Sequence, residues 1–262
     1  MRIDRHIWDV RISRDGRTLL VRTPRRALLV DPSRLPDEAS AVRCAATGED
    51  AFLAPDGRLF AVWVSEPFRE TSRLGRVHFL RAADCAHVST AAALVSTPRA
   101  AAFSPDDSTL MIVGSEGRGS TLYGFRVADG AVTAGPLSFG QVEADGVAFS
   151  HDGARLAVVN GDGHTRVYRA PDLAPLTTYD FNRPGHQVSG RAVAFAPDGR
   201  VFTALIPYGR GAMASWGALE VARDGEALVS LGQSLGMPSD VWFSLDGRFV
   251  GTHRGQYPTQ QT

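Results

Sequence analysis

The sequence predicts an all-β fold made of six repeated units, each containing several short strands. One pattern recurs along the chain: an apolar residue, a small residue, any residue, Asp, usually Gly, and then an apolar run. The copies begin at Ile12, Leu53, Phe103, Phe149, Phe195 and Phe243. Their aspartates, which lie 41, 50, 46, 46 and 48 residues apart, are Asp15, Asp56, Asp106, Asp152, Asp198 and Asp246. A period of this length is typical of the blades of a β-propeller.

Each copy predicts a β-hairpin, because two apolar runs flank a short turn. Proline presets the backbone of the turn, the aspartate can accept a hydrogen bond from the backbone two residues on, and glycine adopts a positive φ without steric cost. The third copy has Asp107 where the others have glycine. Aspartate tolerates the left-handed region better than most residues, so we expect the turn to be kept there.

Composition agrees with a single all-β domain, and the repeat predicts one β-propeller domain over residues 1–262. The chain is 44% hydrophobic and 21% charged, which allows a sizeable core. Its 28 basic and 28 acidic residues balance, so nothing favours nucleic acid or an anionic membrane as a partner. All the basic residues are arginine, a usage that we attribute to a G+C-rich bacterial genome.

The cysteines and the ends of the chain add little. Cys44 and Cys85 belong to no C-x-x-C motif or Cys/His cluster, and we do not expect them to form a disulfide. The N-terminal residues contain no apolar stretch of the signal-peptide kind, and no window approaches 18 apolar residues. The expected compartment is therefore the cytoplasm.

Most units are expected to hold four strands. The first two units predict strands at 7–13, 18–22, 27–31, 59–65, 75–81 and 90–95. The third and fourth predict strands at 100–104, 109–114, 121–127, 131–137, 146–150, 155–160, 164–169 and 175–179. The fifth and sixth predict strands at 191–196, 201–206, 215–222, 227–231, 241–244 and 249–253.

Two units resemble WD-repeat β-propellers in detail. Gly185-His186 precedes Phe195 by the spacing of the Gly-His pair that comes before the innermost strand in that family. RLAVVNGDGHTRVYRAPD from Arg155 resembles its second strand, tight Asp-Gly turn and third strand, with Tyr168-Arg169 in place of Trp-Asp. FRVADG from Phe125 resembles the same strand end. No unit has the full Trp-Asp dipeptide, so the chain resembles a degenerate, WD-like bacterial propeller without the family's His-Asp-Trp hydrogen bonds.

Six units predict six blades, mostly of four antiparallel strands, but the last unit is short. A strand at 257–261 and another at 2–4 would complete it and close the ring. Otherwise the chain would be a piece of a longer propeller with an unpaired edge. We favour the closed or nearly closed ring.

In a propeller, the starts of the first strands and the loops between second and third strands share one face. The residues at these starts include the charged set Asp9, Asp50, Arg99, Asp145, Arg191 and Asp240. The resemblance places Arg99 and Arg191 on either side of Asp145, and Asp240, Asp9 and Asp50 together. One interpretation is a mouth that holds an arginine-bearing peptide loop or a cation. The other is that these carboxylates are solvated or paired with the arginines.

Two long loops on the same face add further candidate binding residues. The loop at 66–74 carries Arg69 and Arg73, and the loop at 207–214 carries Tyr208 and Arg210. Loops on a rigid scaffold often bind partners, and Tyr and Arg are favoured interface anchors. These loops could equally be tolerated insertions.

No catalytic motif is present. The sequence has no G-x-S-x-G, H-E-x-x-H, P-loop or Cys/His zinc spacing, and it predicts no cofactor. The resemblance favours a non-enzymatic scaffold that binds a protein partner on its loop-rich face. The alternative is a propeller hydrolase of the lactonase kind, with a metal held among Asp9, Asp50, Asp145 and Asp240.

Overall fold

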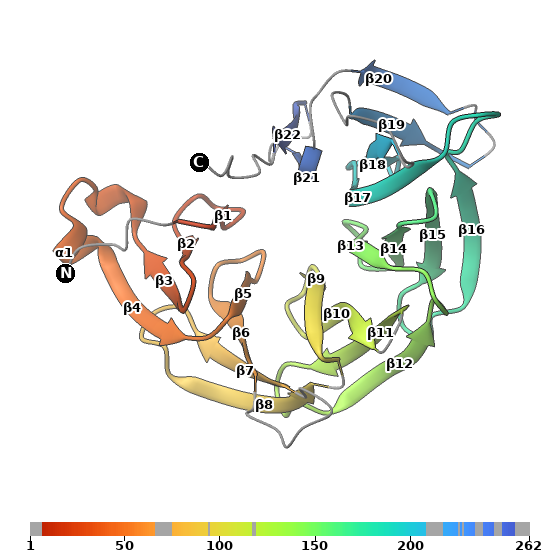
Figure 1. The fold of residues 1–262 in the computed structure, drawn as a ribbon. Coiled ribbons are helices and arrows are strands. Elements are labelled where there is room, and N and C mark those ends of the chain that lie inside the picture. Colours follow the sequence, from red (N-terminus) through yellow and green to blue (C-terminus); the bar gives the residue numbers. More distant parts are fainter. Residues whose placement is uncertain are drawn as a thin grey trace, which may run out of the picture. The chain divides into compact units, whose positions relative to one another are not determined.

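The protein consists almost entirely of antiparallel β-sheet. The computed structural model describes residues 7–65, 75–93, 95–116, 119–207, 217–224, 226, 228–233, 238–243 and 248–254. Within these residues, consecutive strands form five four-stranded sheets and one two-stranded sheet (Figure 1). This arrangement is β-propeller-like and confirms the all-β prediction. The prediction of six blades, and of one domain over the whole chain, stays a prediction.

The first of two compact units covers Met1–Glu116 and Thr121–Leu137 and contains three sheets. Sheet 1 contains β1 (Asp9–Ile12), β2 (Leu19–Arg22), β3 (Arg26–Val30) and β4 (Val42–Thr47). Sheet 2 contains β5 (Asp50–Leu53), β6 (Leu59–Ser65), β7 (Gly75–Arg81) and β8 (His87–Ala93). Sheet 3 contains β9 (Thr97–Phe103), β10 (Thr109–Glu116), β11 (Gly119–Arg126) and β12 (Val132–Ser138). The 3-10 turn η1 (Pro32–Arg34) and the short helix α1 (Glu38–Ala41) connect β3 to β4.

The second unit covers Gly117–Ser120 and Ser138–Thr262 and contains the remaining sheets. Sheet 4 contains β13 (Ala144–Phe149), β14 (Arg155–Asn160), β15 (His164–Arg169) and β16 (Pro175–Asp180). Sheet 5 contains β17 (Val188–Phe195), β18 (Val201–Pro207), β19 (Ala218–Ala222) and β20 (Val229–Gln233). Sheet 6 contains β21 (Pro238–Phe243) and β22 (Val250–Arg254). No helix in the described residues is both long and apolar enough to cross a membrane.

The hairpin turns form as the repeat predicts. At five turns the aspartate accepts the backbone N–H two residues on, at 2.7 to 3.1 Å. In three of them a serine two residues earlier also donates to the carboxylate, as Ser104 does to Asp106 at 2.5 Å. Gly16, Gly57, Gly153 and Gly199 have positive φ, and Asp107 takes the same conformation at 59°. The expectation for Asp107 is therefore confirmed.

The core lies between neighbouring sheets of each unit. Between sheets 1 and 2, Leu20, Leu29 and Phe60 are almost fully buried in one apolar cluster. Between sheets 4 and 5, Val167 and Phe195 take the same role. The larger clusters also include Phe79, Phe103, Leu110, Ile112 and Phe125 in sheets 2 and 3, and Phe202, Leu219 and Val241 in sheets 5 and 6. Sheet-on-sheet packing of apolar faces thus holds each unit together.

Most strand predictions are confirmed, several of them to the residue, as for β6, β7, β14 and β15. The fourth strand of sheet 1 was not predicted, because VRCAAT consists mostly of small and polar residues and has no bulky apolar run. The strands proposed at 2–4 and 257–261, and the start of the strand predicted at 215–222, lie outside the described residues.

The cysteine prediction is wrong, because Cys44 and Cys85 form a disulfide. Cys44 lies in β4 of sheet 1, and Cys85 lies in the turn between β7 and β8 of sheet 2. Their Cα atoms are 5.7 Å apart although 41 residues separate them in sequence. Motif spacing could not reveal the pair, since only the stacking of two consecutive sheets brings these positions together.

Candidate functional site

Two of the predicted residues meet in the second unit. Arg191 Nη1 lies 3.2 Å from Asp145 Oδ2, and the two side chains are 37% and 11% exposed. Each lies at a β-bulge: Asp145 is skipped in the pairing of β13 with β14, and Arg191 in the pairing of β17 with β18. A bulge residue leaves the hydrogen-bonded ladder and redirects its side chain. The bulges therefore explain how one residue from each of two neighbouring sheets can reach the same place.

The same bulge position recurs in other sheets. Arg99 is skipped in the pairing of β9 with β10, and Ser239 in the pairing of β21 with β22. Like Asp145 and Arg191, these two residues lie four positions before the apolar residue that begins the repeated pattern of their unit. The sequence repeat therefore marked the positions of these bulges, although it did not show that they are bulges.

Asp145 and Arg191 line a cleft of about 490 Å³ between sheets 4 and 5. Its walls come from the segment before β13, the β14–β15 turn, the β16–β17 connection and the end of β18. The lining residues are Gln141, Val142, Glu143, Asp145, Gly161, Asp162, Asn182, Gln187, Val188, Ser189, Arg191 and Ile206. Strand starts and second-to-third-strand loops therefore share one face in this unit, as expected.

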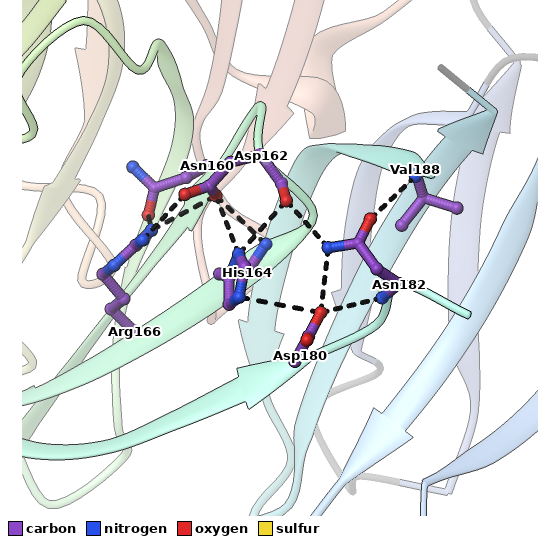
Figure 2. A network of polar contacts seen from close by, with 7 residues as sticks. All are labelled: Asn160, Asp162, His164, Arg166, Asp180, Asn182 and Val188. Atoms are coloured by element: carbon purple, nitrogen blue, oxygen red, sulfur yellow. Dashed lines mark hydrogen bonds and ion pairs between the residues drawn. The ribbon is translucent and has the colours of Figure 1, made fainter. Parts of the chain in front are cut away.

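One wall of the cleft is held by a network of polar contacts (Figure 2). Asp162 accepts from Arg166 Nη2 at 2.7 Å and from Arg166 Nη1 at 3.2 Å, and Arg166 Nη1 also donates to Asn160 at 2.7 Å. The backbone N–H of His164 donates to the same carboxylate at 3.2 Å. Asp162 is thus surrounded by donors, and its position in the β14–β15 turn is fixed.

Asn182 connects this turn to the next sheet. Its Nδ2 donates to the backbone carbonyl of Asp162 at 2.9 Å and to Asp180 Oδ1 at 2.8 Å. Its Oδ1 accepts from the backbone N–H of Val188 at 3.1 Å, at the start of β17. Figure 2 shows Asn182 between Asp162 and Val188. This one amide therefore ties the β16–β17 connection to both sheets that form the cleft.

The His164 ring lies between two acceptors. Its Nδ1 is 3.1 Å from the backbone carbonyl oxygen of Asp162 and 3.3 Å from Asp162 Oδ1. Its Nε2 is 3.6 Å from Asp180 Oδ1. Both ring nitrogens thus face oxygen atoms that can only accept.

The carboxylates of the network are held in the charged form. Burial works to raise the pKa of Asp162, but the hydrogen bonds and charge of Arg166 outweigh it, and the pKa is lowered. The backbone N–H of Asn182 lowers the pKa of Asp180. The hydrogen bond with Asp162 in turn raises the pKa of Arg166. This wall of the cleft therefore keeps its charges across the neutral range.

The other predicted residues lie elsewhere. Asp9 binds Arg11 at 2.9 Å, and Asp50 pairs with Arg22 in the first unit. Arg99 donates to Ser115 Oγ at 3.3 Å, and Asp240 accepts from the backbone N–H of Val241 at 2.9 Å. For these residues the prediction of partner binding stays a prediction. The remaining four, Arg69, Arg73, Tyr208 and Arg210, lie outside the described residues.

The structure offers no support for the metal interpretation. In the part of the chain that it describes, no group of three or more His, Cys, Asp or Glu side chains is placed to hold a metal ion. Asp9 and Asp50 instead flank Arg22, whose charge interacts with Asp9 and which contacts Asp50. The sequence analysis left open that these carboxylates pair with arginines. Asp50 does pair with an arginine, but with Arg22 and not with Arg99 or Arg191.

Sequence reasoning missed Asp162, His164, Asp180 and Asn182 as members of the site. The tight Asp162-Gly163 turn was predicted, but only as scaffold. The signal that could have found them is the loop position, since a second-to-third-strand turn belongs to the same face as the strand starts. The hydrogen bonds of Asn182 could not be predicted from the sequence, because they depend on the path of residues 181–187.

Comparison with known proteins shows the fold and not a family. No protein-family model matches the chain. No curated protein matches it either. The hydrazine synthase of Kuenenia stuttgartiensis is similar in structure, with a TM-score of 0.68 at 15% sequence identity, over 95% of this chain and 74% of that one. In all, 1329 solved chains match this structure.

Proposed function

We propose that the protein is a non-catalytic binding module that takes up a segment of a partner protein in the cleft between sheets 4 and 5. The observation that supports this best is the Asp145–Arg191 pair, which two bulges present at a cleft of about 490 Å³. Pockets of about 300–1,000 Å³ are typical of small-ligand sites, so this cleft has room for a side chain of a bound segment. The segment would lie across the face where the strands begin.

The charges of the cleft favour a segment with an arginine or lysine. Three carboxylates, those of Glu143, Asp145 and Asp162, line it against one guanidinium, that of Arg191. Arg166 neutralises Asp162 from the strand behind. The residues that line the cleft are therefore richer in carboxylates than in guanidiniums, and a cationic side chain is the better electrostatic complement.

The walls are rigid enough to preorganise such a site. Thr165 and Thr203 share a buried hydrogen bond of 3.0 Å between sheets 4 and 5. Tyr179 donates to Asp224 at 2.7 Å, and the Arg155 guanidinium stacks over the Phe195 ring at 5.1 Å. These contacts tie the two sheets together, so that binding would require little reorganisation.

The test uses an array of synthetic 15-residue peptides that differ only at the central residue: arginine, lysine, glutamine or glutamate. We expect arginine and lysine peptides to bind more tightly than the glutamine and glutamate peptides, and salt to weaken them. Asp145→Asn should weaken the arginine peptide about tenfold, as loss of a hydrogen-bonded charge does. Fluorescence polarisation measures both effects.

The matched control is Asp172→Asn. Asp172 is also an aspartate of sheet 4 bound to an arginine, Arg169 at 2.5 Å, but it lies in the β15–β16 turn and does not line the cleft. This variant should bind like the unmodified protein. Equal affinity for all four peptides, or an equal loss in Asp145→Asn and Asp172→Asn, would contradict the proposal.

A further inference from the structure

We infer that a second copy of this chain docks its sheet 6 against sheet 1, so that molecules associate head to tail. Sheet 1 has an apolar face turned away from sheet 2, and sheet 6 has an apolar face turned away from sheet 5. The contact between sheets 2 and 3 shows how two such faces fit together. No residue of either face lines the cleft, so this association does not depend on the proposed function.

Strand pairing identifies the apolar face of sheet 1. Leu20 packs on sheet 2, so its neighbours Leu19 and Val21 point to the other side of the sheet. Val10 pairs with Val21 and Ile12 pairs with Leu19, and directly paired residues share a face. Val10 and Ile12 are 49% and 61% exposed. The β1 end of this face is therefore apolar and open to solvent.

Sheet 6 presents the complementary kind of face. Val241 and Phe243 pack on sheet 5, so Trp242 between them points away from sheet 5. Trp242 pairs with Gly251 and stands over it, since a Cβ atom on that glycine would meet the indole ring. Trp242 is 52% exposed, and Phe249, directly before β22, is 65% exposed. Sheet 6 thus exposes two large aromatic residues to solvent.

The contact between sheets 2 and 3 is the template for the inferred interface. The three residues of the sheet 6 face occupy the repeat positions that sheet 2 fills with Phe52, Leu59 and Ala61. The four residues of the sheet 1 face occupy the repeat positions that sheet 3 fills with Ala101, Phe103, Leu110 and Ile112. All of these sheet 2 and sheet 3 residues belong to one apolar cluster. The two exposed faces therefore occupy the positions through which consecutive sheets pack.

A second copy is the partner because each molecule carries one face of each kind. Both faces are exposed in a single molecule, and exposed apolar surface of this kind marks interaction sites. The two faces differ, so the contact is heterologous and can repeat from molecule to molecule. Sheet 6 contributes two described strands, so the contact is small and the association weak. The ring closure predicted from the sequence would instead cover both faces within one molecule and leave a monomer.

The experiment is sedimentation velocity of the 262-residue chain at concentrations from about 5 to about 500 µM, the range of a weak contact. We expect the weight-average sedimentation coefficient to rise with concentration. Ile12→Asp places a charge on the sheet 1 face, and Trp242→Asp places one on the sheet 6 face. Each variant alone should stay monomeric. Both residues are more than half exposed, so the fold should be kept, and circular dichroism checks this.

Mixing the variants tests that the two faces bind each other. An equimolar mixture of Ile12→Asp and Trp242→Asp should form a dimer and nothing larger, because each molecule keeps the face that the other has lost. Val10→Asp and Phe249→Asp are a second pair with the same expected behaviour. Leu176→Asp is the control, because Leu176 is 52% exposed in β16 of sheet 4 and belongs to neither face. It should associate like the unmodified protein.

Several results would overturn the inference. An unmodified protein that stays monomeric over the whole range would mean that the chain covers these faces itself or does not use them. Association of Trp242→Asp alone would mean that the sheet 6 face is not needed. A monomeric mixture of the two variants would show that the faces do not bind each other. Loss of association in Leu176→Asp would show that any added charge prevents it.

Discussion

Asp107 and Asp162 are both turn aspartates, but their surroundings give them opposite charge behaviour. Asp107, in the β9–β10 turn, is 8% exposed, and its Oδ1 has no hydrogen-bond partner among the described residues. Burial and the neighbouring Asp56 raise its pKa to about 7. Asp162 is surrounded by the N–H groups of Arg166 and His164, and its pKa is lowered despite burial. Donor groups, more than burial, decide whether a turn carboxyl stays charged.

The largest effect is expected at the well-partnered residue. Asp162→Ala removes two hydrogen bonds from Arg166 and one from His164 and leaves the Arg166 guanidinium without its carboxylate. We expect the free energy of unfolding to fall by about 2–3 kcal/mol, since bonds to charged groups are the costly ones to lose. Urea denaturation measures it. Asp172→Ala, at an exposed turn, is the control and should cost much less; an equal loss would mean that the network does not stabilise the fold.

A gain is expected at the poorly partnered residue. Asp107→Gly removes a buried carboxyl whose Oδ1 has no hydrogen-bond partner among the described residues. It also places glycine, which adopts a φ of 59° without strain, at this position. At pH 8 we expect the free energy of unfolding to rise by about 1–2 kcal/mol. The same denaturation measurement applies. A loss of stability would show that the Asp107 side chain makes a favourable contact, and the contrast with Asp162 would then be wrong.

The smallest effect is a pH dependence. Because the raised pKa of Asp107 lets the folded state keep a proton that the unfolded chain loses, stability falls as pH rises from about 4 to about 7 and is level above. Asp107→Asn keeps the size of the side chain and should flatten the curve in this interval. If the slope of stability against pH is the same in Asp107→Asn, the pH dependence belongs to another titratable group.

The hairpins were predictable because their chemistry is local. Asp15, Asp56, Asp106, Asp152 and Asp198 bind the backbone two residues away, so residues close in sequence contain the whole motif. Apolar runs such as those of β6 and β14 are equally local. The repeat also placed Asp145 and Arg191 on one face, because equal positions in consecutive repeats occupy equal positions in consecutive sheets.

The rest depended on contacts between distant residues. Cys44 and Cys85 meet only because sheet 1 packs on sheet 2. Asn182 lies in a connection without a strand pattern, and its contacts with Asp162 and Val188 follow from the path of that connection. The choice of Arg22 as the partner of Asp50 also reflects sheet stacking. Sequence thus predicted the turns and the face of the cleft, and not the network that holds it.

The bulges also bear on how such a protein can evolve. Arg99, Asp145, Arg191 and Ser239 are skipped by the strand pairing of four sheets, so the hydrogen-bonded ladder does not constrain which side chain stands there. The turn motif that specifies each hairpin lies at the opposite end of the same strand. A duplicated repeat would therefore keep all the turn residues that its hairpin needs. It would also contain one bulge position that can be substituted without changing those residues. New specificity could arise there without a new fold.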